Sequence, residues 1–393
     1  MDTRNVQWVV KISKLCNLRC TYCYEYPFLA DRMRMKLDDL RNMFDHIAEC
    51  YSDSPKRMDF VWHGGEPLLI EPQYYEKIGE IQHEAFDKMD IPFTNSIQTN
   101  LSVINDEIID LFQNFFQYVG VSIDLFGDQR LNLAGKSSQE PVLRNMQNLI
   151  DNKINFGCIT VLSKFTAPHV DEIYCFFEDI DTSFRFLPIY RTGYESQQDN
   201  LALSDEEIVS SFKKVVDHWF ASDSYIQVRP IQDYVANVVC RLDGGAGPRH
   251  YYDKNKNEVL YIVDTDGSLY SNADAYNPKL CHGNIFRTSL PMIVKSATHL
   301  HAIELANQRM DSVCPECRYY GVCSGFFMAE ATPEQRYVDD LGHLKCGIAL
   351  PVQRYIEDLL IKSGLVDTNS DVLLADKIRS RLKERKEDGM FDG

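Results

Sequence analysis

Six short runs of β-branched and aromatic residues alternate with longer amphipathic stretches over about the first 220 residues of this 393-residue chain. Alternation of this kind predicts repeated strand and helix units, and therefore a parallel sheet covered by helices. Crossovers between parallel strands are right-handed, so we expect an open, partial (β/α)6 barrel of TIM-like design, with its functional residues at the carboxyl ends of the strands. The expected strands are Val6 to Ile12, Met58 to Trp62, Phe93 to Gln98, Tyr118 to Ile123, Phe156 to Leu162 and Phe184 to Leu187.

The alternation fades after about residue 220, so the chain divides into a barrel at residues 1–220, a second unit at 221–350 and a helical tail at 351–393. The second unit contains an expected hairpin around Asp266-Gly267 and a Cys-rich segment from Cys314 to Cys346. The tail ends in KERKEDGMFDG, a charged stretch that predicts a solvated, fraying helix. The expected fold is therefore an α/β partial barrel with a small C-terminal domain.

The charge of the chain limits its partners. Lys and Arg number 41 against 58 Asp and Glu, and the formal net charge of −17 disfavours nucleic acid and anionic membranes and suits a basic peptide better. The start lacks the long apolar region of a signal peptide, and no later apolar run approaches the roughly 18 residues that span a bilayer. We therefore expect a cytoplasmic protein with no nucleic-acid or membrane partner.

Twelve cysteines in a chain of this size without an export signal indicate metal or redox sites rather than disulfides. Cys50, Cys158 and Cys175 fall within apolar patterns and are expected in the core, where unpaired thiols are often found. The spacing of the remaining cysteines decides what they bind.

The first cysteine set directly follows the first expected strand, in KLCNLRCTYCYEY with the spacing C-x3-C-x2-C. Its members are Cys16, Cys20 and Cys23. Three thiolates on one loop can bind three irons of a cubane and leave the fourth iron open to a small chelating ligand. The alternative is three thiols that are buried or bind zinc, although no nearby fourth ligand completes a tetrahedral zinc site.

This loop, including Tyr22 before the last cysteine, resembles the signature of radical S-adenosylmethionine (SAM) enzymes, which implies a [4Fe-4S] cluster and SAM as cofactors. After the second expected strand comes a stretch that resembles the GGEP motif of the family, which binds the SAM amino group. Its residues are Gly64, Gly65, Glu66 and Pro67. Glycines let a backbone approach a ligand closely, and carbonyls plus a carboxylate can accept hydrogen bonds from an ammonium. Taken alone, the same residues are also compatible with an ordinary turn.

Two further strand ends match patterns of peptide-modifying members of the family. They are Gln98-Thr99-Asn100 after the third strand and Ser122-Ile123-Asp124 after the fourth. The resemblance implies that the first and last residues of each triplet bind the cofactor, with Ser122 at the SAM ribose or carboxylate. Arg144 is the expected partner of the SAM carboxylate, and Arg130 is the competing candidate. For each residue alone, a surface or helix-capping role is the alternative.

The second cysteine set lies in VCPECRYYGVC and GHLKCGI. Its members are Cys314, Cys317, Cys323 and Cys346. This run resembles the SPASM domain of peptide-modifying radical SAM enzymes and implies one auxiliary [4Fe-4S] cluster, with a structural zinc site as the alternative. A second auxiliary cluster is not expected, because Asn272 and Phe327 occupy positions where that domain has cysteines, although Cys240 and Cys281 lie nearby.

The resemblance implies oxidative chemistry started by a 5′-deoxyadenosyl radical. SIDLFGDQRLNLAG followed by RNMQNLI looks most like the peptide cyclophane synthases, which join an aromatic ring carbon to a β-carbon in a ribosomal precursor peptide. The first alternative is a maturase similar to the anaerobic sulfatase-maturating enzymes, which form formylglycine. Asp274 is then the candidate catalytic base, with turn capping as its other role. The second alternative is a non-catalytic Fe–S or zinc scaffold that binds a peptide.

The expected partners are a ribosomal precursor peptide and an external one-electron donor. Because the chain begins almost directly with its first strand, we expect a leader peptide to bind the barrel, the second unit or a separate leader-binding protein. No motif names the peptide or the residues that are modified.

Overall fold

The computed structural model describes residues 5–53, 56–189, 200–224, 226–243, 259–271, 277–331 and 338–365. Within these residues one ten-stranded sheet has the order β10-β9-β8-β1-β2-β3-β4-β5-β6-β7. The strands are β1 Val6–Ser13, β2 Met58–Gly64, β3 Phe93–Thr99, β4 Tyr118–Ser122, β5 Phe156–Leu162, β6 Phe184–Pro188, β7 Val228–Arg229, β8 Leu260–Val263, β9 Ser268–Ser271 and β10 Gly283–Asn284. Strands β1 to β7 pair in parallel, as does β8 with β1, whereas β9 pairs antiparallel with both β8 and β10.

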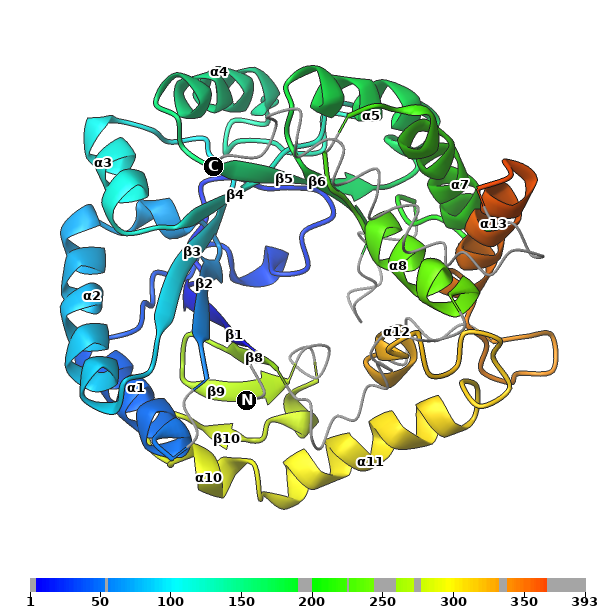
Figure 1. Ribbon diagram of the computed structural model, residues 1–393. Coiled ribbons are helices and arrows are strands. Elements are labelled where there is room, and N and C mark those ends of the chain that lie inside the picture. Colours follow the sequence, from blue (N-terminus) through cyan, green and yellow to red (C-terminus); the bar gives the residue numbers. More distant parts are fainter. Residues whose placement is uncertain are drawn as a thin grey trace, which may run out of the picture.

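Each of the six strands expected from the sequence is present, and their bounds lie within two residues of the expected ones. A helix follows each of the strands β1 to β7, and Figure 1 shows these helices around the outside of a curved, open sheet. They are α1 Leu37–Tyr51, α2 Pro72–Phe86, α3 Asp106–Asn114, α4 Gln139–Asp151, α5 Val170–Asp179, α7 Asp205–Ala221 and α8 Ile231–Leu242. The partial α/β barrel is therefore confirmed.

The C-terminal part adds α10 Leu290–Ile293, α11 Ala297–Asp311, α12 Phe326–Ala329 and α13 Ala349–Lys362. Short 3-10 turns lie at η1 Tyr26–Phe28, η2 Pro67–Leu69, η3 Asp87–Met89, η4 Ala167–His169 and η6 Pro278–Leu280. Helix α13 packs against α7 and α8, and the charged end of the chain beyond residue 365 lies outside the described residues. None of the described helices is both long and apolar enough to cross a membrane.

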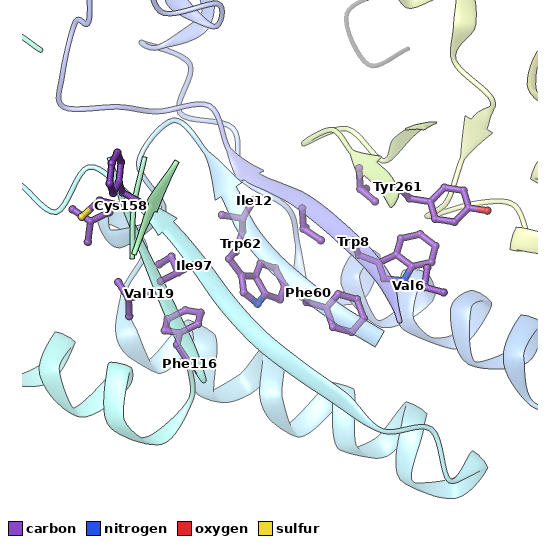
Figure 2. Packing of buried hydrophobic residues seen from close by; sticks show 14 of the residues in the cluster. Val6, Trp8, Ile12, Phe60, Trp62, Ile97, Phe116, Val119, Cys158 and Tyr261 are labelled. Atoms are coloured by element: carbon purple, nitrogen blue, oxygen red, sulfur yellow. The ribbon is translucent and has the colours of Figure 1, made fainter. Parts of the chain in front are cut away.

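Alternation along the strands places one set of side chains on the outer face of the sheet, against the helices. Trp8, Phe60 and Trp62 are fully buried there (Figure 2). The Phe60 ring lies 5.3 Å from that of Phe44 in α1 and 5.7 Å from that of Phe86 in α2. Burying side chains of this size stabilises a fold by roughly 1.5–3 kcal/mol each. The intervening residues face the concave side, where polar groups from neighbouring strands can meet.

The sheet continues past residue 220 into the second unit. Strand β8 pairs with β1, and the Tyr261 ring stacks on that of Trp8 with centroids 4.7 Å apart. The expected hairpin joins β8 to β9, and Gly267 within it has a φ of 88°, a conformation that residues with a side chain rarely adopt. The second unit therefore supplies edge strands to the barrel sheet.

The three cysteines expected in the core lie in different environments. Cys158 is buried and Cys50 is half-buried, but Cys175 is exposed, so the prediction for Cys175 is wrong. The buried face of α5 includes Ile173 and Phe177, and the helical period turns Cys175 to the opposite face.

Candidate cluster and cofactor site

The first cysteine set lies on the loop after β1, at the carboxyl end of the sheet. Cys16 and Cys20 are buried and Cys23 is half-buried. Burial raises the pKa of Cys16 to about 11 and that of Cys23 to about 12, and thiolates so close together repel one another. Bound iron would reverse this preference, because a coordinating thiol is deprotonated outright. Three crowded thiols, two of them buried, therefore fit a cationic iron–sulfur cluster better than they fit a set of free thiolates.

Hydrogen bonds to sulfur add to this fit. The Leu18 amide donates to Cys16 Sγ at 3.4 Å, and the Asn100 side-chain amide donates to the same sulfur at 3.8 Å. Asn100 also donates to Asn17 Oδ1 at 3.0 Å, so the end of β3 is fastened to the cysteine loop. Among the described residues, no three Cys, His, Asp or Glu side chains stand at the spacing of a single metal ion.

The GGEP stretch packs directly on the cysteine loop. The Gly65 amide donates to the Ser13 carbonyl at 2.8 Å, and the Glu66 amide donates to the Leu15 carbonyl at 2.8 Å. A Cβ added at Gly65 would lie 2.3 Å from the Leu15 oxygen and 2.4 Å from the Lys14 oxygen. Glycine is required here because two backbones meet with no room for a side chain.

The Glu66 carboxylate is buried and accepts three hydrogen bonds from its own chain. Its donors are the amides of Leu68 at 2.9 Å and Asn100 at 2.7 Å and the Thr99 hydroxyl at 2.7 Å. Burial raises the pKa of Glu66, while these donors lower it. Glu66 thus joins the ends of β2 and β3, and its carboxylate is held by groups of its own chain.

Two other predicted residues meet on the concave side of the sheet. The Gln98 side-chain amide on β3 donates to the Ser122 hydroxyl on β4 at 2.8 Å. The strand register places Gln98 opposite Gly120, whose missing side chain leaves space for the amide. This pair presents a hydroxyl and an amide at the carboxyl end of the strands, where a ligand of a parallel barrel binds.

Tyr22, Asp124 and Arg130 form a polar group beside the cysteine loop. The Tyr22 hydroxyl donates to Asp124 Oδ2, and Arg130 Nη1 donates to the Tyr22 oxygen at 2.9 Å. Asp124 Oδ1 accepts from the Val161 amide at 2.8 Å, which fixes the carboxylate. Arg130 Nε is buried and has no hydrogen-bond partner among the described atoms, so this guanidinium can still bind an acceptor.

The structure does not bring Arg144 to this group. Arg144 lies on the exposed side of α4, where its guanidinium is 3.6 Å from Glu140 one turn away. Arg130 comes close because backbone bonds from Arg19 to Leu131 and from Thr21 to Gln129 fasten its loop to the cysteine loop. The competing candidate from the sequence therefore has the geometry for an anion at the cofactor site.

A buried ion pair below the cysteine loop was missed by the sequence reasoning. Lys11 Nζ on β1 lies 2.5 Å from Glu25, and both side chains are almost wholly buried. A lysine inside the apolar run of the first strand was the available signal, since Lys is rarely buried unless it is paired. The pair ties the second residue after the last cysteine of the loop to the sheet.

The second cysteine set faces one pocket. The four thiols line it together with Met310, Phe327 and Gln353. Burial, and then repulsion from its neighbours, raises the pKa of Cys314 to about 12, and burial raises that of Cys346 to about 11. As at the first set, the gathering of thiols, here half-buried, fits a bound metal cluster. Asp274 and Asn272 lie outside the described residues.

A buried carboxylate holds the loop of the second set in place. Glu357 of α13 accepts from Arg241 of α8 at 2.6 Å, from Arg318 at 2.7 Å and from the Tyr319 hydroxyl at 2.5 Å. Arg318 and Tyr319 directly follow Cys317 in the sequence. Glu357 therefore connects the Cys-rich loop to two helices.

Replacing Glu357 with Gln is expected to destabilise the protein by about 3 kcal/mol, because two arginines lose the charge that compensates them. Iron bound at the second set should fall with it, since the loop loses its attachment. Urea denaturation and iron counting check this, with Glu140→Gln as the control because Glu140 forms an exposed pair. Equal stability of the two variants would contradict the role of Glu357.

Comparison with known proteins agrees with this geometry. Residues 10–214, more than half of the chain, match the family model described as the radical SAM superfamily. The chain belongs to the radical SAM superfamily. This class binds SAM at a [4Fe-4S] cluster, which is what the three thiols and the polar strand ends fit.

Among curated proteins, the chain is similar to a cysteine-type anaerobic sulfatase-maturating enzyme of Clostridium novyi, at 24% identity over 79% of this chain and 84% of the relative. A serine-type anaerobic sulfatase-maturating enzyme of Bacteroides thetaiotaomicron is 25% identical over 81% of each chain. Among solved structures, anSMEcpe with bound AdoMet and Cp18Cys peptide has a TM-score of 0.72 at 20% identity and covers 93% of this chain and 99% of its own. Streptococcus suis SuiB bound to precursor peptide SuiA has a TM-score of 0.56 at 14% identity and covers 87% and 76%. These structural likenesses concern the fold.

Proposed function

We propose that the chain is a maturase that oxidatively modifies a ribosomally made peptide and forms a carbon–carbon crosslink between an aromatic ring carbon and a β-carbon. The observation that carries this proposal is the pair of cysteine sets, one of three thiols beside polar strand ends and one of four thiols around a single pocket. The names of the relatives support a peptide or protein substrate, since they are sulfatase-maturating enzymes and a structure bound to a precursor peptide.

When bound, a [4Fe-4S] cluster with SAM supplies a 5′-deoxyadenosyl radical that can take hydrogen from an unactivated C–H bond. The chain's own residues hold and orient the reactants. We assign the SAM amino group to the carbonyls of residues 64–67, the ribose to Ser122 with Gln98, and the carboxylate to Arg130. Tyr22 and Asp124 position Arg130, and Asn100 positions Cys16.

We place one auxiliary [4Fe-4S] cluster at the second cysteine set. Four thiols would fill its ligand positions, so it would accept an electron rather than bind substrate. Formation of the crosslink removes two hydrogens from the peptide. One would leave as a hydrogen atom to the deoxyadenosyl radical, and the other would leave as a proton while its electron passed to the auxiliary cluster. An external one-electron donor would reduce the first cluster to start the reaction, and the auxiliary cluster would be oxidised again by returning its electron to the first cluster, so that SAM is the net oxidant. A reducing compartment such as the cytoplasm suits both clusters.

The test is an anaerobic reaction of reconstituted protein with SAM, dithionite and short peptides encoded next to its gene. About eight irons per chain, 5′-deoxyadenosine and a peptide product lighter by two hydrogens support the proposal. A crosslink also keeps the linked segment together during peptide fragmentation in the mass spectrometer. Zinc in place of iron at the second set, or a filled cluster that leaves SAM intact, would overturn it and favour the scaffold.

Formylglycine formation is the second candidate, and the sulfatase-maturating relatives favour it. In that reaction Asp274 would act as the base. Its product carries an aldehyde, which reacts with a hydrazide probe, whereas a crosslinked peptide does not. The same reaction mixture therefore separates the two candidates.

The two candidate arginines for the SAM carboxylate give opposite expectations. Arg130→Lys is expected to weaken SAM binding at least about tenfold, because a lysine cannot reproduce the fork of donors that holds a carboxylate. Arg144→Ala should bind SAM as the unchanged protein does, since Arg144 faces solvent. Anaerobic equilibrium dialysis of the cluster-bound proteins measures both. Weaker SAM binding by Arg144→Ala, with unchanged binding by Arg130→Lys, would instead assign the SAM carboxylate to Arg144.

A further inference from the structure

An arginine on the concave side of the barrel has no role in the binding of SAM described above. Phe184 and Phe186 of β6 are buried on the outer face, and the Phe184 ring lies 4.4 Å from that of Phe177 in α5. Arg185 stands between these two residues in the strand, so its side chain faces the inside of the barrel. Its side chain is accessible there rather than packed in the core.

The strand register places Arg185 in one row with the cofactor site. Ser122 on β4 pairs with Ile159 on β5, Ile159 pairs with Arg185, and Arg185 pairs with Arg229 on β7. Neighbouring strands lie roughly 4.8 Å apart, so the Arg185 backbone is about 10 Å from that of Ser122. An extended arginine side chain spans much of that distance. Its guanidinium can therefore reach the space in front of the residue assigned to SAM.

The positive charge of Arg185 is poorly compensated. Arg229, its neighbour on β7, forms an ion pair with Asp233 one turn along in α8. No carboxylate among the described residues forms an ion pair with Arg185 itself. Surrounding protein lowers the pKa of Arg185, and the like charge of Arg229 lowers it further, whereas attraction to Asp233 opposes them. On the other side of Arg185, the members of its row are Ile159 and Ser122, which carry no charge.

Arg185 also lies toward the second cysteine set. Tyr234 of α8 is among the groups that act on its guanidinium, and the Tyr234 ring lies 5.8 Å from that of Phe327 on α12. Phe327 lines the pocket of the four thiols, and Figure 1 shows α12 beside α8. A group bound to Arg185 would thus lie on the side of the barrel where α8 and α12 carry the second cysteine set.

We propose that Arg185 is a specificity-determining residue that binds a carboxylate of the substrate peptide, supplied by an Asp or Glu near the modified residue. This inference rests on the proposed peptide-modifying function and names the chemistry of its substrate. A guanidinium recognises a carboxylate through two parallel hydrogen bonds, which gives both charge and geometry. The net charge of −17 attracts a basic peptide at long range. At short range, Arg185 selects one acidic residue within that peptide.

The experiment selects peptides that bind the protein with both clusters and SAM in place. It is done anaerobically and without reductant, so that SAM is not cleaved and no peptide is modified. The probe is a displayed library of ten-residue peptides with one fixed central tyrosine and all other positions random. The unchanged protein is expected to enrich Asp or Glu at one fixed distance from the tyrosine. Arg185→Gln should lose that preference, and Arg185→Glu should enrich Lys or Arg at the same position. Arg41→Gln is the matched control, because Arg41 is exposed on α1 and pairs with Glu84.

An enriched peptide is then synthesised as a matched Asp and Asn pair. The Asp form should bind the unchanged protein about tenfold or more tightly than the Asn form, and the two should bind Arg185→Gln equally. No acidic preference in the unchanged protein, or a preference that survives in Arg185→Gln, overturns the proposal. Melting temperatures of the variants establish that they are folded.

Two further outcomes separate this inference from other readings. The carboxylate of SAM is the other source of the same chemistry, and a tenfold loss of SAM affinity in Arg185→Gln would assign the arginine to SAM and overturn the proposal. Peptides that are selected and modified without an acidic preference leave the proposed function intact and refute only the role of Arg185. A protein that cleaves SAM but neither selects nor modifies any peptide refutes the proposed function and this inference together.

Discussion

Replacing Cys16, Cys20 and Cys23 together with alanine is expected to abolish SAM cleavage and to lower the iron content by about four atoms per chain. The three thiols are the ligands proposed for the first cluster, and without it SAM has no open iron to bind. The loop should remain close to its present form, because backbone bonds from Cys16 to Leu29 and from Thr21 to Gln129 hold it. Iron counting and 5′-deoxyadenosine measurement check both parts.

The matched control for this triple variant replaces the thiols of the second set. Cys314, Cys317 and Cys323 changed together should also remove about four irons, but should leave cleavage of SAM in the absence of peptide measurable. Loss of the peptide product with continued formation of 5′-deoxyadenosine would separate the two clusters by function. Cleavage of SAM by the first triple variant would refute the assignment of the radical site.

Replacing Gly65 with alanine should prevent the cysteine loop from closing on the sheet. The new Cβ would lie 2.3 Å from the Leu15 carbonyl oxygen, and the two bonds that join the segments leave the backbone little freedom to move. We expect a loss of about 3 kcal/mol or more in the free energy of unfolding, as for severe overpacking, together with loss of the first cluster. Urea denaturation and iron content measure the two effects.

Gly135→Ala is the control for backbone strain. Gly135 has a positive φ, 72°, but no atom lies within 4 Å of an added Cβ there. Its replacement should cost only about 1–2 kcal/mol, the usual penalty of the left-handed conformation for a residue with a side chain. If both variants lost the same stability and kept their iron, the close approach at Gly65 would not matter for the site.

The sequence predicted the barrel strands closely because each alternates between a buried outer face and an inner face. It did not predict that β8 joins β1, since pairing between segments some 250 residues apart leaves no local pattern. From the sequence, Arg144 was preferred to Arg130 as the partner of the SAM carboxylate. The structure favours Arg130 instead, for a similar reason. Arg144 lies on a helix that the sequence predicts, whereas Arg130 reaches the cofactor site only because its loop bonds to the cysteine loop.

The cysteine motifs were more informative than any other part of the sequence. Their spacing sets which sulfurs can share one centre, and the structure places each set at one location. Spacing says nothing about charges on the wall of the barrel. The lysine within the apolar run of the first strand was a signal for Lys11, whereas no pattern singled out Arg185. The roles of Lys11 and Arg185 depend on which face of each strand is concave and on which charged residues the neighbouring strands place beside them.

The pairing of β8 with β1 also sets an order of events during synthesis. Strand β1 leaves the ribosome first, yet one of its edges finds its partner only after residue 263 has been made. Until then, the backbone of Val6–Ser13 and the face of Trp8 that Tyr261 covers stay open on the nascent chain. Two thirds of the protein must be made before its first strand is protected, so slow translation or delayed release of this chain should favour aggregation through that edge.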